Sequence, residues 1–259
     1  MKPNNTRGPR PLGRIMGQHF LNSPSAIQKI LGAAELDATD TVLEIGPGAG
    51  VLTRELLIRA KKVLAIEKDP RLATALREEF AGARNLELVE GDVLKIFAVG
   101  ARTQTPKLPK AYKIVANIPY YITAQILRLF LEETKTKPSR MVLMIQKEVA
   151  ERIVAAPPEM SLLALSVQAY GKARIISRVP RGSFVPPPRV DSAILCIDNI
   201  SDTFFGEHRI RPKDFFEITR RAFSQKRKML RKSLGIENVY ATKRPQELSL
   251  EDWTHILAP

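Results

Sequence analysis

Four residues at regular spacing are the best candidates for a reactive site in this sequence. Gly46 lies in the glycine-rich segment EIGPGAG (44–50), and Glu67, Asp92 and Asn117 follow it at intervals of 21, 25 and 25 residues. Each interval fits one strand plus one crossover, so we expect all four along the carboxyl edge of one parallel sheet. Because carboxylates accept hydrogen bonds from hydroxyl and amino groups, the pattern predicts a site for an adenosine-bearing cofactor.

The acidic residues of this set suggest distinct contacts. Glu67 would accept both ribose hydroxyl protons, and Asp92 would accept from the exocyclic amine of the cofactor's adenine. Glu44 could orient either the glycine loop or the amino-acid end of the cofactor. Taken singly, each carboxylate is better explained as a solvated loop residue or a helix cap, and it is the regular spacing of the set that favours a site. A dinucleotide-binding pattern would require glycine at Val51, so a nicotinamide cofactor is disfavoured.

The elements expected to position these residues are short apolar runs that alternate with helical patterns. The runs suited to buried strands are 41–45, 62–66, 86–90, 112–116 and 140–145. Apolar residues at three-and-four spacing predict helices at 51–60, 70–80, 124–133 and 148–156, and an earlier helix begins at Ser23. Segment 97–110 is expected to be a turn and surface loop. The alternation indicates an α/β protein with a parallel sheet.

The end of the chain has a different character. Two more strand-like runs, 173–179 and 192–198, precede a region that reads as helical from about residue 201. The helices expected there are 212–223, 226–234 and 249–257. We therefore predict two domains, a catalytic domain over 1–200 that starts with a basic arm (1–16), and a small all-helical domain over 201–259.

Charge and composition narrow the function. The chain has 41 Lys and Arg against 27 Asp and Glu, a formal charge of +14, which favours a polyanionic partner. One cysteine and three scattered histidines support neither a disulfide framework nor a metal site. The start of the chain lacks an apolar leader, and no run approaches the ~18 apolar residues of a membrane span. We expect a cytoplasmic protein without a membrane anchor.

A basic tract near the C-terminus is the predicted contact surface for nucleic acid. Residues 218–236 contain no acidic side chain. The basic residues are Arg220, Arg221, Lys226, Arg227, Lys228, Arg231 and Lys232. Such a cluster favours binding to phosphates, although a solvated helix face is the alternative. The arm at 1–16 adds further positive charge.

The motifs together resemble the ribosomal RNA adenine N6,N6-dimethyltransferases of the KsgA type. The matching segments run from GQHFL (17–21) through EIGPGAG, GDVL, NIPYYI, QKEVAERI, SFVPPPRVDSA and RRAFSQKRKMLRKSL to RPQELSLEDW. The resemblance implies a Rossmann-like class I fold and the cofactor S-adenosyl-L-methionine. It also implies dimethylation of adjacent adenosines near the 3′ end of small-subunit rRNA during ribosome biogenesis, with the pre-ribosomal small subunit as the partner. We expect the protein to be a monomer.

The same resemblance implies roles for individual residues. Its pattern assigns cofactor contacts to six of them, His19, Leu21, Gly46, Glu67, Asp92 and Asn117. His19 departs from the pattern, in which Asn is common at this position. Phe184, in SFVPPPRV, is implied as a second wall for the target base. Sequence alone favours a core position for Phe184.

The segment NIPY (117–120) suits methylation of an adenine amine. The amine is a poor nucleophile because its lone pair is delocalised into the ring, and two acceptors on its hydrogens would favour the attacking, pyramidal form. The Asn117 side-chain oxygen and the Ile118 carbonyl can be those acceptors, and Pro119 stiffens the turn. Tyr120 supplies a ring face for the base. Cys196, in AILCI, is predicted to be a buried apolar residue rather than a nucleophile.

Two other functions compete with this one. A related large-subunit rRNA methyltransferase that confers antibiotic resistance also carries NIPY, although RPQELSLEDW argues against it. A ribosome-assembly factor with vestigial methylation is the other alternative, and the intact segment from Asn117 to Tyr120 argues against lost chemistry.

Overall fold

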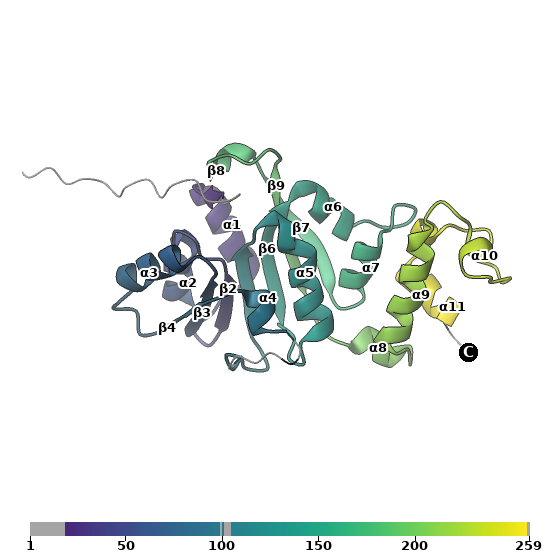
Figure 1. Cartoon of the computed structure of the whole chain (residues 1–259), viewed down its shortest axis with the longest axis horizontal. Coiled ribbons are helices and arrows are strands. Elements are labelled where there is room, and N and C mark those ends of the chain that lie inside the picture. The colour runs from purple at the N-terminus through teal and green to yellow at the C-terminus, as the bar shows by residue number, and fades with distance from the viewer. Residues whose placement is uncertain (1–18, 99, 101–104, 258–259) are drawn as a thin grey trace, which may run out of the picture.

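A computed structural model describes residues 19–98, 100 and 105–257 of the 259-residue chain. The predicted basic arm (1–16) lies outside the described residues. Figure 1 shows a central sheet with helices on both faces and a group of C-terminal helices beyond α7 (Leu162–Gln168) at one end. This agrees with the α/β class expected from the sequence.

The main sheet has seven strands in the order β4-β3-β2-β5-β6-β9-β7. Their bounds are β2 (Thr41–Ile45), β3 (Lys62–Glu67), β4 (Leu86–Glu90), β5 (Lys113–Asn117), β6 (Arg140–Gln146), β7 (Lys172–Val179) and β9 (Ser192–Asp198). Strands β4, β3, β2, β5 and β6 are parallel, whereas β9 pairs antiparallel with both β6 and β7. From β2 the strand order runs to one side through β3 and β4, and to the other side through β5 and β6. The boundary between β2 and β5 is therefore the switch point, where open α/β sheets bind ligands.

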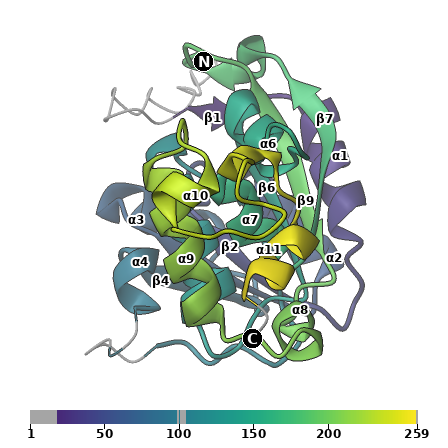
Figure 2. The same ribbon diagram turned by 90° about the vertical axis from the view of Figure 1, so that its right-hand side faces the viewer.

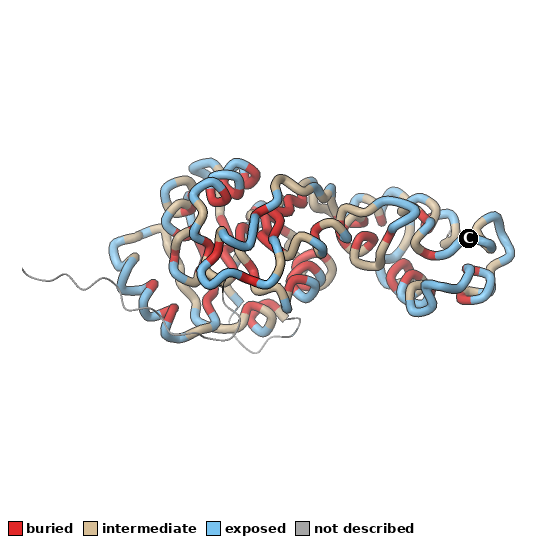
Figure 3. The backbone as a smooth tube through the Cα atoms, turned by 90° about the horizontal axis from the view of Figure 1, so that it is seen from above, coloured by how far each residue is buried: buried red, intermediate tan, exposed pale blue. Residues whose placement is uncertain are grey.

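Helices cover both faces of the sheet. On one face lie α1 (Pro24–Ala34) and α2 (Val51–Arg59), whose apolar residues join Val42, Val115 and Cys196 in one buried layer. The other apolar layer includes residues of α5 (Thr123–Arg128), η2 (Leu129–Glu133), α6 (Lys147–Ile153) and α7. Figure 3 shows buried residues, in red, within the main body of the molecule and again among the C-terminal helices. Cys196 is buried and unpaired, as expected from its apolar segment.

Local sequence explains where several elements begin. Ser23 caps α1 with its hydroxyl, and Asp69 caps α3 (Pro70–Glu79) with its carboxylate; in both helices proline occupies the first turn. A short helix, α4 (Val93–Ile96), precedes the predicted loop, and Asp92 caps it. A separate two-stranded ribbon joins β1 (Phe20–Leu21) to β8 (Phe184–Val185), so the start of the described chain lies beside the SFVPPP segment.

The C-terminal region is helical, with one difference from the prediction. Its elements are α8 (Thr203–Glu207), α9 (Pro212–Ser224), α10 (Leu230–Ser233), η4 (Pro245–Glu247) and α11 (Leu250–Leu257). The predicted helix at 226–234 is wrong, because only Leu230–Ser233 is helical and a turn occupies the residues before it. Like charges four residues apart, at 227/231 and 228/232, would repel one another in a longer helix.

The C-terminal helices pack on the rest of the molecule through aromatic side chains. Figure 2 shows α9 and α11 in front of α7. The ring of Tyr170 lies 5.2 Å from that of Phe205 and 6.1 Å from that of Phe216, between centroids. The buried Trp253 belongs to the same apolar cluster as the sheet. The core therefore continues across the predicted domain boundary at 201.

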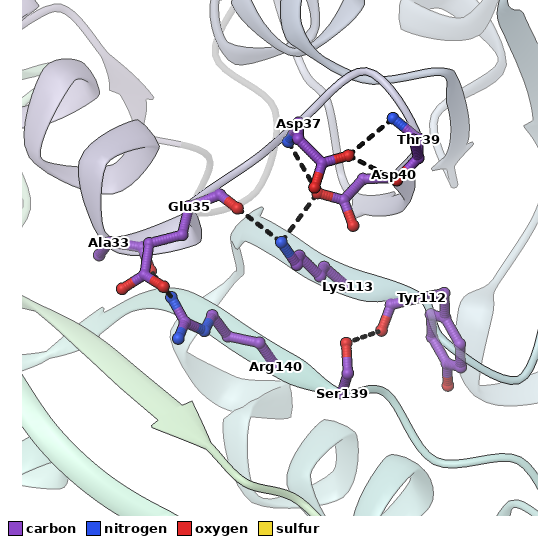
Figure 4. A network of polar contacts seen from close by, with 9 residues as sticks. All are labelled: Ala33, Glu35, Asp37, Thr39, Asp40, Tyr112, Lys113, Ser139 and Arg140. Carbon is purple, nitrogen blue, oxygen red and sulfur yellow. Dashed lines mark hydrogen bonds and ion pairs between the residues drawn. The ribbon is translucent and has the colours of Figure 1, made fainter.

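The amino ends of β5 and β6 carry a network of paired charges (Figure 4). The Lys113 ammonium donates to the Glu35 carbonyl at 2.6 Å and to the Asp40 carboxylate at 2.8 Å. The Arg140 guanidinium lies 2.7 Å from the Glu35 carboxylate and donates to the Ala33 carbonyl at 3.0 Å. These contacts tie the end of α1 and the loop before β2 to the sheet.

Candidate active site

A cavity of about 560 Å³ lies at the carboxyl ends of β2, β3 and β5. It is lined by residues 19–21, by the glycine-rich segment, by the residues that follow β3 and β4, and by residues 117–122. Nine of the predicted site residues therefore meet in one place. They are His19, Leu21, Gly46, Glu67, Asp92, Asn117, Ile118, Pro119 and Tyr120.

The glycine-rich loop has a backbone that other residues could not easily adopt. Gly46 has φ +66°, and a Cβ added there would meet no atom within 4 Å, so its backbone is open to a ligand. Gly50 has φ +73° and begins α2; a Cβ there would lie 2.8 Å from the Phe80 ring. Glycine at 46 keeps the loop open to a ligand, and glycine at 50 allows α2 to pack closely.

Glu67 is held in place at the end of β3. Its carboxylate accepts one hydrogen bond from the Gly48 amide at 3.0 Å and one from the Asp69 amide at 2.9 Å. The residue is 4% exposed. Each carboxylate oxygen has more than one acceptor site, so both can still accept a hydroxyl proton. The geometry thus permits the predicted contact with a ribose.

Asp92 combines a cap with an ion pair. One oxygen accepts from the Leu94 amide at 3.0 Å, and the other lies 2.9 Å from the Lys68 ammonium. This hydrogen bond and the negative charge of Asp92 raise the pKa of Lys68. Sequence reasoning did not identify Lys68, although its position directly after Glu67 at the end of β3 was the available signal.

Glu44 is the most unusual group in the cavity wall. It is 1% exposed, and one of its carboxylate oxygens has no hydrogen-bond partner among the described residues. Burial raises the pKa of Glu44 to about 8, and the nearby charge of Glu67 adds to the rise. A protonated Glu44 can both donate and accept a hydrogen bond. Glu44 is among the residues that line the cavity, and an unpartnered buried polar atom in such a wall is typical of a site for a polar ligand.

The NIPY segment forms the turn from β5 into a 3₁₀ turn, η1 (Tyr120–Ile122). The Asn117 amide donates to the His19 carbonyl at 3.3 Å, which leaves the side-chain oxygen of Asn117 available as an acceptor. The Tyr120 hydroxyl lies 2.7 Å from that of Ser192 on β9, and its ring stacks with His19 at 6.2 Å. Sequence reasoning missed Ser192, which the matched segment SFVPPPRVDSA contains.

Phe184, which the resemblance implies as a wall of the site, is buried in the core. It is 2% exposed, pairs with Leu21 across the β1–β8 ribbon and belongs to the apolar layer under α1. It is not among the residues that line the cavity. The structure thus places Phe184 in the core, in line with its composition, and its role as a second wall for the base stays a prediction from the resemblance.

The basic tract divides into two groups. Six of its side chains are exposed and make no ion pair within the described part of the chain, namely Arg221, Lys226, Arg227, Lys228, Arg231 and Lys232. Arg220 instead lies 3.3 Å from the Glu132 carboxylate and over the Phe216 ring. Arg221 is exposed on α9. Arg220 thus contributes to packing between α9 and the catalytic region.

Two further findings concern a membrane span and a metal site. None of their helices is long and apolar enough to cross a membrane. Within residues 19–98, 100 and 105–257, no group of three His, Cys, Asp or Glu side chains could hold a metal ion.

The sheet order, the glycine loop after β2 and the acidic residues that end β3 and follow β4 define a class I S-adenosyl-L-methionine-dependent methyltransferase. The cavity suits that cofactor, with open backbone at Gly46, acceptors at Glu67 and Asp92, and the unpartnered oxygen of Glu44. A family model described as ribosomal RNA adenine dimethylase matches residues 14–251. The chain belongs to the ribosomal RNA adenine dimethylase family.

Individual relatives agree with this membership. The chain is 46% identical over 253 residues to ribosomal RNA small subunit methyltransferase A of Dehalococcoides mccartyi, covering 92% of this chain and 84% of the relative. It resembles the crystal structure of a dimethyladenosine transferase from Plasmodium falciparum with TM-score 0.75 and 30% identity, over 92% and 96% of the two chains. It also resembles the crystal structure of the 23S rRNA methyltransferase ErmE, with TM-score 0.69 and 28% identity, over 93% of this chain and 100% of ErmE.

Proposed function

We propose that this protein transfers methyl groups from S-adenosyl-L-methionine to N6 of two adjacent adenosines near the 3′ end of small-subunit rRNA. The observation that carries the proposal is that Asn117–Tyr120 share one cavity with Glu67 and Asp92. The cofactor residues and the residues suited to an adenine amine thus face the same space. The proposed setting is ribosome biogenesis in the cytoplasm, with the protein acting as a monomer on the pre-ribosomal small subunit.

The cofactor, when bound, supplies a methyl group already activated on a sulfonium. The side-chain oxygen of Asn117 and the carbonyl of Ile118 accept hydrogen bonds from the adenine amine, which directs the nitrogen lone pair toward that methyl group. The cofactor would supply the methyl carbon with its sulfonium as the leaving group, and the adenine nitrogen would provide the electron pair of the new bond and lose a proton to solvent. No covalent intermediate with the protein is required, which agrees with the burial of Cys196.

Tyr120 holds the target base in this scheme. Its ring is fixed by the 2.7 Å contact with Ser192 and by stacking with His19. A base stacked on an aromatic ring gains about 1–3 kcal/mol, which offsets part of the cost of removing an adenosine from its own stack. Because the Tyr120 ring is half-buried, it orients the base toward Asn117 instead of presenting it to solvent.

The exposed basic turn provides the affinity for RNA. Lys226, Arg227 and Lys228 lie between α9 and α10 without acidic partners in the described chain, so they are available to phosphates. Such contacts position RNA without reading its sequence, so the choice of adenosine depends on the cavity and on the shape of the particle.

Mass spectrometry of rRNA incubated with enzyme and cofactor tests the proposal. We expect two dimethyladenosines in unmethylated small ribosomal subunits, and a slower single-turnover rate for Tyr120→Ala with little change in cofactor affinity by calorimetry. Primer extension across both rRNAs distinguishes the alternative activity of ErmE, because modification of large-subunit RNA would replace the proposed substrate. Binding to pre-ribosomal particles without methyl transfer would favour an assembly factor.

A further inference from the structure

Tyr121 presents an exposed aromatic ring beside the site. It is 74% exposed and yet lines the cavity together with Tyr120. The two tyrosines begin the 3₁₀ turn η1, in which successive side chains diverge by about a third of a turn. Tyr120 therefore points inward to Ser192 while Tyr121 points outward at the mouth of the cavity.

Exposure alone would not require an explanation, since single apolar side chains are common on surfaces. Ile58 on α2 is also 74% exposed, but it lies outside the cavity. Tyr121 differs because it directly follows the residues that face the target amine. Lys68 lines the same cavity as Tyr121; its side chain is 68% exposed and lies 2.9 Å from the Asp92 carboxylate. The Tyr121 ring could stack on a nucleobase, and the Lys68 ammonium could contact a phosphate of the same RNA.

The proposed substrate needs a partner at this position. When one adenosine enters the cavity, the base next to it in the RNA loses a stacking partner. The phosphodiester link holds that neighbouring base close to the mouth. An exposed ring there can replace the lost stacking, which is worth about 1–3 kcal/mol per base.

We infer that Tyr121 is a stacking platform for the nucleobase adjacent to the adenosine being methylated. Because the two proposed target adenosines are neighbours on a strand of fixed polarity, Tyr121 would stack on the other target during one of the two methylations and on the base flanking the pair during the other. The inference rests on the proposed function and assigns Tyr121 a contact with the substrate. Lys68 would then lie near the phosphate that connects the two bases.

The experiment compares methylation of an RNA hairpin that carries two adjacent adenosines in its loop. Tyr121→Leu removes the ring, and we expect kcat/KM for RNA to fall about 5- to 150-fold, the equivalent of about 1–3 kcal/mol. Cofactor affinity, measured by calorimetry, should change far less. Tyr121→Phe keeps the ring and should lie closer to wild type than Tyr121→Leu. Ile58→Ala is the matched control, with equal exposure away from the mouth.

A second substrate separates stacking from a general loss of structure. In a hairpin whose flanking nucleotide is abasic, wild type should lose as much activity as Tyr121→Leu loses on the intact hairpin. Tyr121→Leu should be nearly as active on the abasic hairpin as on the intact hairpin, because it has no ring to stack on the missing base. Equal activity of wild type and Tyr121→Leu on intact RNA, or additive losses, would overturn the inference. Absence of wild-type methylation on unmethylated small subunits would instead overturn the proposed function.

Discussion

The amino and carboxyl edges of the central sheet both carry ionisable side chains, but within the described chain these side chains are paired at the amino edge and incompletely paired at the carboxyl edge. At the amino edge, the charges of Lys113 and Arg140 are matched by carboxylates and carbonyls of the α1–β2 connection. At the carboxyl edge, Glu44 keeps an unpartnered oxygen and Glu67 retains acceptor capacity toward an open cavity. Charges with internal partners hold the fold, whereas incompletely paired groups remain available to ligands.

The largest effect is expected at the carboxyl edge, where Asn117 faces the reacting amine. Asn117→Ala should lower the single-turnover rate by about 10²–10³-fold at saturating cofactor, as loss of one preorganised polar contact does elsewhere. Asn117→Asp keeps an acceptor and should retain more activity than alanine. A wild-type rate for Asn117→Ala would mean that this edge does not contact the amine.

Cofactor affinity should respond to the same edge. Glu67→Ala removes a charged acceptor, and we expect binding to weaken by about 10- to 100-fold, the range for hydrogen bonds to a charged group. Asp40→Ala is the matched change at the amino edge and should leave the affinity unaltered in calorimetry. Equal effects of the two variants would erase the contrast between the edges.

Stability should respond to the amino edge. Lys113→Met leaves the Asp40 carboxylate and the Glu35 carbonyl without this donor, at a cost of about 1–3 kcal/mol in free energy of unfolding. Urea unfolding should show this loss while cofactor affinity is retained. Lys110→Met, an exposed lysine just before β5, is the control and should not change stability.

The raised pKa of Glu44 predicts a pH dependence from the carboxyl edge. Between the ordinary value of 4.5 and about 8, the unfolded chain releases this proton and the folded chain retains it. The free energy of unfolding should therefore fall as pH rises through that window, by at most about 1.4 kcal/mol per pH unit. In thermal unfolding scans at several pH values, Glu44→Gln should reduce the fall in stability with rising pH. Glu90→Gln, the control, should show the same fall as wild type. A decline unchanged in Glu44→Gln would assign it to another group.

The smallest effect is expected in the C-terminal helices, where an arginine without an ion pair among the described residues can be compared with an ion-paired one. Arg227→Ala should reduce the slope of log RNA affinity against log salt by about 0.7–0.9, one phosphate contact. Arg220→Ala should instead lower stability, because its guanidinium pairs with Glu132 and lies over Phe216. Filter binding over a range of salt concentrations checks Arg227→Ala, and urea unfolding checks Arg220→Ala. An unchanged slope for Arg227→Ala would place the RNA surface elsewhere.

Most of the sheet was predictable because buried strands leave a strong local signal. The runs at 41–45 and 62–66 match β2 and β3, and the intervals between polar residues predicted one shared edge. The helix at 226–234 failed because repulsion among its basic residues outweighed its apolar spacing. For Phe184, composition favoured the core and the resemblance favoured the site; the β1–β8 pairing placed it in the core.

Sequence by itself determined the α/β class, the cofactor-binding edge and the motif set, because strand periodicity and glycine turns act over a few residues. Only tertiary structure decided which groups keep free hydrogen-bonding capacity. Ser192 reaches Tyr120 from 72 residues away, and Lys113 reaches Asp40 from 73. Such pairings depend on how distant strands and loops meet, and that arrangement separates a structural charge from one that can bind a ligand.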